Sequence, residues 1–159
     1  MRVLALAALL SLHCDDQPAQ HATQSRPMDE PRAQEVIAKT FQNEGIEPEA
    51  GRSVTLTSQS VKLEVGATGH KYGVVWLTRE IAPKLASLLP KHDNDEGPLV
   101  VLDGIGKDAG AHVLVLWETD YVTDDLAGEA HASTEIAAEA KLERDVRDFL
   151  VKAKSDQWP

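Results

Sequence analysis

The stretch Leu99-Val100-Val101-Leu102, followed after nine residues by His112-Val113-Leu114-Val115-Leu116-Trp117, carries the strongest strand signals in the chain. Short apolar runs rich in β-branched residues and bounded by turn residues predict strands. The connection, DGIGKDAGA over residues 103–111, is shorter than the dozen or so residues that a crossover between parallel strands requires. We therefore expect these two strands to be antiparallel neighbours joined by a glycine-rich loop.

Outward from this pair, alternating apolar and polar residues predict further strands, and apolar residues at helical spacing predict helices. The strands are expected over 54–57, 61–65 and 72–77, and the helices over 31–41, 78–89 and 134–153. The resulting order, αβββαββα, is typical of α+β domains. We expect a single α+β domain over residues 31–159, with a mostly antiparallel sheet of about five strands and three packed helices.

The chain begins with one positive charge, Arg2, followed by an almost wholly apolar run over residues 3–12. This pattern matches the charged and apolar regions of a secretory signal peptide. The run is too short to span a membrane, which needs about 20 apolar residues. We expect residues 1–13 to be a leader that exports the protein; the alternative is a buried segment of the folded domain.

The only cysteine, Cys14, follows the apolar run closely and precedes Asp15 and Asp16. This arrangement resembles the leader of bacterial lipoproteins, in which the cysteine becomes the lipidated first residue. The resemblance covers residues 1–14, and Ser11 and His13 stand where that family usually has Leu and a small residue. It implies a lipid on Cys14 that anchors the protein to the membrane, on the periplasmic or outer face of the bacterial envelope. The alternative is a soluble secreted protein.

Residues 14–30 are polar, include two prolines and show no periodicity, which predicts a disordered tether. A tether of about 16 residues has a root-mean-square reach of about 20–25 Å. The chain has a net charge of −10, and removal of Arg2 with the leader makes it −11. An acidic surface argues against a nucleic-acid partner, which needs clustered Lys and Arg. The expected partners are the membrane, through the lipid, and an envelope protein or small ligand.

The loop between the two clearest strands holds the first candidate site. Antiparallel pairing places Asp103 and His112 at the same end, within hydrogen-bonding reach. A carboxylate that orients an imidazole supports general-base catalysis or metal binding, whereas the alternative is a polar pair that fixes the turn. Lys107 and Asp108 lie on the loop above the pair, and His70 begins another strand. We treat these three as candidate ligand-binding residues.

An acidic stretch after the second strand provides the other candidate site, with Glu118, Asp120, Asp124 and Asp125 as possible metal ligands. Clustered carboxylates can hold Ca²⁺ or Mg²⁺, but the spacing is not that of an EF-hand loop. The alternative is a solvated acidic loop. The only cofactor that these residues predict is a weakly bound divalent cation.

Two functions are compatible with these features. The first is a lipid-anchored envelope protein that acts as a small binding or interaction domain without catalysing a reaction. The alternative is a metal-dependent or general-base hydrolase that uses Asp103 and His112. A hydrolase should place this pair in a concave pocket with another polar group, whereas a binding domain should present an apolar patch or groove.

Overall fold

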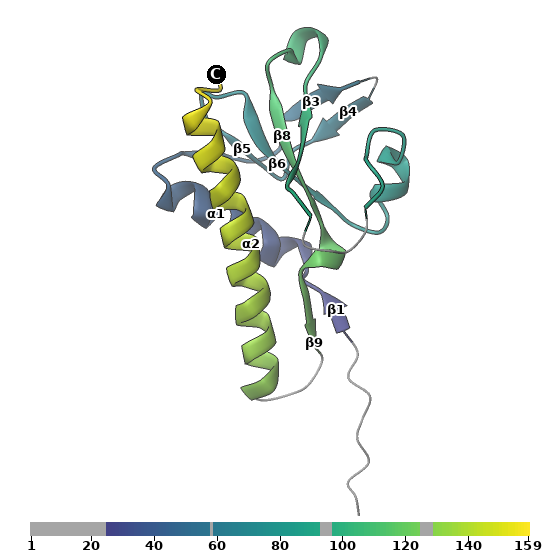
Figure 1. The fold of residues 1–159 in the computed structure, drawn as a ribbon, viewed down its shortest axis with the longest axis vertical. Helices are drawn as coiled ribbons and strands as arrows, with labels where there is room; N and C mark the ends of the chain where they lie inside the picture. The colour runs from purple at the N-terminus through teal and green to yellow at the C-terminus, as the bar shows by residue number, and fades with distance from the viewer. Residues whose placement is uncertain (1–24, 58, 93–96, 125–128) are drawn as a thin grey trace, which may run out of the picture.

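Two parallel strands, β6 (Tyr72–Leu77) and β8 (His112–Trp117), form the centre of the fold in the computed structural model (Figure 1). The structure describes residues 25–57, 59–92, 97–124 and 129–159. Every residue of β6 is buried, as are five of the six residues of β8. Strands that are apolar throughout are typical of a sheet covered on both faces.

The other three strands extend this pair into a mixed five-stranded sheet of order β2-β5-β6-β8-β7. On one side, β5 (Val65–Ala67) pairs antiparallel with β6, and β2 (Pro48–Glu49) pairs antiparallel with β5. On the other side, β7 (Val100–Asp103) pairs antiparallel with β8. This last pairing confirms the prediction from the two clearest strands, with Asp103 opposite His112.

Two helices cover one face of the sheet. They are α1 (Glu30–Asn43) and α2 (Glu129–Ser155), which pack against each other. Because side chains alternate along a strand, each central strand contributes to two separate cores. The helix-side core takes Tyr72, Val74, Trp76, Leu114 and Leu116 from the sheet. The core on the other face takes Val75, Leu77, Val113, Val115 and Trp117.

The second core is covered by a hairpin and an irregular segment. Strands β3 (Ser53–Leu56) and β4 (Gln59–Lys62) form a separate two-stranded sheet, and residues 81–89 pack beside it. The predicted strand 61–65 is divided between β4 and β5. The first two predicted strands therefore pair with each other as a hairpin, but this hairpin covers the main sheet and is not part of it.

Two parts of the predicted architecture are wrong. The helix expected over residues 78–89 is a single 3-10 turn, η1 (Ala82–Leu85), so the described residues form two α-helices where three were expected. Pro83 lacks the backbone N–H that a continuing helix needs, and Pro90 closes the segment. The sheet is mixed, because the segment from Thr78 to Leu99 carries the chain past β8 before it returns through β7.

A short ribbon of β1 (Ser25–Pro27) and β9 (Val122–Asp124) lies at the end of the molecule opposite the C-terminus (Figure 1). The predicted tether therefore overlaps the folded region, and its residues 14–24 lie outside the described residues, as do the predicted leader 1–13 and Cys14. Two more 3-10 turns, η2 (Gly106–Asp108) and η3 (Glu118–Asp120), flank β8. No helix in the described part of the chain is long and apolar enough to cross a membrane.

Gly73 allows the hairpin to approach the central strand closely. A Cβ atom at this position would lie 2.6 Å from Leu63 Cδ1 and 2.8 Å from the backbone oxygen of Val65. Both distances are shorter than van der Waals contact, and the backbone oxygen belongs to the neighbouring strand β5. The position therefore requires a residue without a side chain.

We expect Gly73→Ala to lower the free energy of unfolding by about 1–3 kcal/mol, because the added methyl group overpacks the junction of β4, β5 and β6. Urea denaturation monitored by circular dichroism measures the change. Ser60→Ala, at an exposed position of β4, is the control and should change stability by no more than about 0.5 kcal/mol. Equal stability of Gly73→Ala and the wild type would contradict the close packing described here.

Candidate functional site

The central strands β6 and β8 end at the same edge of the sheet, with Leu77 beside Trp117. Ligands of open sheets commonly bind at the carboxyl ends of parallel strands, where successive loops diverge. Here the chain leaves β6 through Thr78 and Arg79 and leaves β8 through η3. Residues from both loops meet at this edge and line a concave surface.

A histidine, an aspartate and a tryptophan are locked together at this edge. His92 Nε2 lies 2.8 Å from Asp120 Oδ1, and the imidazole stacks on the Trp117 ring with 4.0 Å between centroids and 3° between planes. Asp120 comes from η3 and Trp117 is the last residue of β8. The hydrogen bond and the stacking together fix the orientation of the imidazole.

Two adjoining hollows lie against this cluster, with volumes of about 450 and 580 Å³. They share Pro90, Lys91 and Trp117, and we call them together the Trp117 groove. Each volume falls within the usual range of small-molecule sites, about 300–1,000 Å³. The remaining lining is mostly apolar: His92, Gly97, Pro98, Leu99, Val100 and Val115 in one hollow, and Arg79, Ala82, Pro83, Ala86 and Leu89 in the other.

The carboxylates predicted to bind a metal are directed to separate partners. Glu118 Oε1 accepts the backbone N–H of Arg79 at 2.8 Å, and Asp120 pairs with His92. Asp124 lies on β9, and Asp125 is outside the described residues. Within the described ranges, no three His, Cys, Asp or Glu side chains are grouped so as to hold a metal ion. The divalent-cation site therefore stays a prediction.

The predicted pair of Asp103 and His112 does form, at 2.8 Å between Asp103 Oδ1 and His112 Nδ1. The imidazole also stacks on Trp158, with 4.0 Å between ring centroids. The backbone N–H of Lys71 donates to the Pro159 carbonyl at 2.6 Å. We call this set of contacts the C-terminal clamp, because it holds the end of the chain against the amino ends of β6 and β8.

The clamp does not form a pocket around the pair. The Asp103 side chain is 79% exposed, and neither Asp103 nor His112 lines the two hollows of the Trp117 groove or the cavities of about 80, 90 and 330 Å³ in the described residues. Stacking on Trp158, which itself packs 5.6 Å from the Phe149 ring, accounts for the position of His112. These contacts are compatible with the alternative of a polar pair that fixes the turn, and the catalytic role of Asp103 and His112 stays a prediction.

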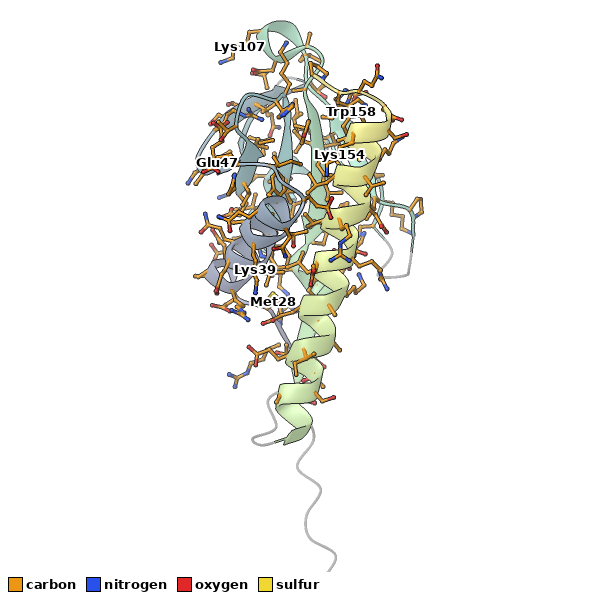
Figure 2. All side chains as sticks on the ribbon, turned by 90° about the vertical axis from the view of Figure 1, so that its left-hand side faces the viewer. Met28, Lys39, Glu47, Lys107, Lys154 and Trp158 are labelled. Carbon is orange, nitrogen blue, oxygen red and sulfur yellow. The ribbon has the colours of Figure 1, made fainter. Side chains whose placement is uncertain are left out.

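The three predicted ligand-binding residues are only partly brought together. Lys107 and Asp108 line a cavity of about 80 Å³, whereas His70 is not in its lining and packs against the Tyr72 ring at 5.0 Å. Asp108 Oδ2 accepts the backbone N–H of Thr55 at 2.7 Å, and this bond lowers the pKa of the carboxyl. Figure 2 shows Lys107 and Trp158 at the same end of the molecule.

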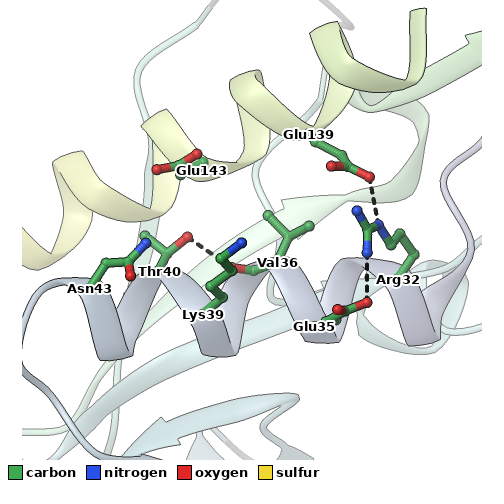
Figure 3. Close-up of a pocket in the computed structure, with 8 residues that line it drawn as sticks. All are labelled: Arg32, Glu35, Val36, Lys39, Thr40, Asn43, Glu139 and Glu143. Carbon is green, nitrogen blue, oxygen red and sulfur yellow. Dashed lines mark hydrogen bonds and ion pairs between the residues drawn. The ribbon is translucent and has the colours of Figure 1, made fainter. Parts of the chain in front are cut away.

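A polar pocket of about 90 Å³ lies between α1 and α2 (Figure 3). The residues that line it form hydrogen bonds and ion pairs with one another. The Arg32 guanidinium donates to Glu139 Oε1 at 2.5 Å and to Glu35 Oε2 at 2.7 Å, and these bonds raise the pKa of Arg32. The Thr40 hydroxyl donates to the Val36 carbonyl at 2.8 Å. The pocket therefore serves to join the two helices.

The Trp117 groove was not predicted from the sequence. His92 lies in a polar stretch between prolines, and no motif connects it with Asp120, which is 28 residues away.

Comparisons with protein-family models, with curated proteins and with solved structures found no match.

We predict that His112 and Trp158 stabilise the protein jointly. His112→Ala and Trp158→Ala should each lower the free energy of unfolding, and the double mutant should lose less than the sum, with a coupling of about 0.5–1.5 kcal/mol. Urea denaturation of the four proteins measures this coupling. His112→Phe, which keeps a stacking ring but loses the bond to Asp103, should retain most of the coupling. A coupling near zero would show that the stacking contributes nothing to the clamp.

Proposed function

We propose that this chain is an exported, lipid-anchored envelope protein whose domain binds a small ligand or a segment of another protein in the Trp117 groove, without catalysing a reaction. The observation that carries the proposal is the Trp117 groove itself. It combines an apolar lining, a volume suited to a ligand, and one imidazole held in a fixed orientation.

The lining suits binding because stacking fixes the orientation of the Trp117 and His92 rings. Pro83, Pro90 and Pro98 also each restrict the backbone φ angle at their own position. Preorganised surfaces lose little conformational entropy on binding, which favours affinity. We propose that the ligand presents a compact apolar or aromatic group to Trp117 and a hydrogen-bonding group to His92.

The proposed lipid places this groove near a membrane. Cys14 precedes β1 by eleven residues, which span at most about 40 Å when fully extended. The chain runs from β8 through η3 directly into β9, the partner of β1. The Trp117 groove therefore lies at the same end of the sheet as β1, the described strand nearest to Cys14 in the sequence. With a lipid on Cys14, we propose that a ligand close to the membrane surface is within reach of the groove.

The anchoring part of the proposal predicts that the full chain, expressed in a diderm bacterium, incorporates labelled palmitate and sediments with membranes. Cys14→Ser should abolish both, because no other thiol is present to carry the lipid. Asp15→Ser serves as a control that leaves the thiol in place and should remain labelled. Labelling that persists in Cys14→Ser would refute lipidation at this residue.

The binding part predicts that neutral aromatic probes occupy the groove. Indole and p-cresol, added to purified ¹⁵N-labelled protein, should shift the Trp117 indole N–H resonance in a saturable way with a Kd of about 1 mM. Ala86→Glu introduces a charge into the lining and should weaken binding about tenfold or more. Ala140→Glu is the matched control, an exposed helical alanine outside the groove, and should bind as the wild type does.

Shifts that cluster away from Trp117, or that persist unchanged in Ala86→Glu, would contradict the proposed binding site. The hydrolase alternative makes a different prediction, namely activity that depends on Asp103 and His112. If Asp103→Asn leaves the affinity for the probes unchanged, binding in the Trp117 groove does not depend on the pair of Asp103 and His112.

A further inference from the structure

The outer edge of β7 carries backbone groups that face no other described strand. Among the described strands, β7 is the last of the sheet and pairs with β8 alone. The Gly104 N–H donates to the Ala111 carbonyl at 2.7 Å, and hydrogen-bonded pairs alternate with non-hydrogen-bonded pairs along an antiparallel ladder. In this register Leu102 is bonded to Val113, whereas Val101 directs its N–H and C=O outward. No described residue is hydrogen-bonded to these outward groups of Val101.

The chain itself already binds a strand to the continuation of this edge. Just beyond β7, the Ile105 N–H donates to the Thr55 carbonyl at 2.9 Å, and Leu56 forms an antiparallel bridge with Gly104. Thr55 and Leu56 belong to β3, which is followed by its hairpin partner β4. The edge is therefore occupied by an extended segment at Gly104 and Ile105, and it is open at Val101.

The open part of the edge lacks the features that usually prevent edge strands from pairing. Proteins commonly protect such edges with proline or with charged side chains. At the opposite edge of the sheet, β2 consists of Pro48 and Glu49, so it has one of each. Residues 99–102 are Leu-Val-Val-Leu, and Leu99 is 38% exposed. This stretch is therefore suited to pairing with a further strand.

The open edge borders the Trp117 groove. Leu99 and Val100 line the hollow of about 450 Å³ together with Trp117. Side chains alternate between the two faces of a strand, and Val100 packs on the same face of the sheet as Trp117. A strand added beside β7 would therefore place every second side chain on the face where the hollow lies.

We propose that the partner bound in the Trp117 groove is an extended peptide segment, which adds as a further strand to the outer edge of β7. This inference rests on the proposed function and specifies the class of ligand for the same site. Backbone hydrogen bonds to Val101 supply affinity, and an apolar or aromatic side chain in the hollow supplies selectivity. A small ligand in the hollow would leave the backbone of Val101 unpaired. An extended segment with apolar side chains at alternate positions satisfies both parts of the site.

The test titrates the purified ¹⁵N-labelled protein with the peptide acetyl-Thr-Val-Thr-Phe-Thr-Val-Lys-amide. Saturable binding with a Kd of about 0.1–1 mM should shift the Trp117 indole N–H resonance. Bound peptide should also slow hydrogen exchange of the Val101 amide about tenfold, because the amide gains a partner. The Leu102 amide, which is already bonded to β8, is the internal reference and should exchange at an unchanged rate.

Two N-methylated versions of the peptide separate backbone pairing from capture of the side chains. One is methylated at the Thr residues and the other at the Val and Phe residues, so each loses the N–H groups of one edge and keeps every side chain. The version whose methyl groups face Val101 should bind about tenfold more weakly than the parent, and the other should bind as the parent does. Val101→Pro blocks the same edge at a position where proline is tolerated, and it should make all three peptides bind equally weakly.

Equal affinity of the two methylated peptides, or an unchanged exchange rate at Val101, would overturn strand addition. If indole binds and the parent peptide does not, the extended partner is wrong and the proposed function stands. If neither binds, the proposed function fails as well. Protection of the Val101 amide that increases with protein concentration in the absence of peptide would assign the edge to a second copy of the chain, and would also overturn the proposal.

Discussion

The pairing of β6 with β8 is the constraint on which the rest of the structure depends. Both strands are apolar on both faces, so each face of the sheet must be covered. The two helices cover one face, and the β3–β4 hairpin with residues 81–89 covers the other. Because the two strands are parallel, the loops that follow them lie at one end of the sheet and the segments that precede them lie at the other end. The loops that follow the strands form the Trp117 groove, and residues at the amino ends of the strands form the C-terminal clamp.

The sequence was sufficient where neighbouring residues determine the outcome. Antiparallel pairing of β7 and β8, and the contact of Asp103 with His112, follow from a short loop between two apolar runs. The parallel pairing of β6 with β8 joins segments about 40 residues apart, which periodicity alone does not reveal. The apolar spacing of residues 78–89 indicated a helix, but Pro83 and packing against Trp117 favoured an irregular segment. The same segment brings His92 to Asp120, so one error concealed the groove.

The two histidine–aspartate pairs use the same physical arrangement at opposite ends of β8. In each, a carboxylate fixes an imidazole that stacks on a tryptophan, Trp117 in one and Trp158 in the other. In each ring, stacking covers one face. The hydrogen bond to the aspartate engages one of the two ring nitrogens. Their surroundings then decide what each pair can do. His92 lines a hollow, whereas His112 holds the C-terminal residues against the sheet.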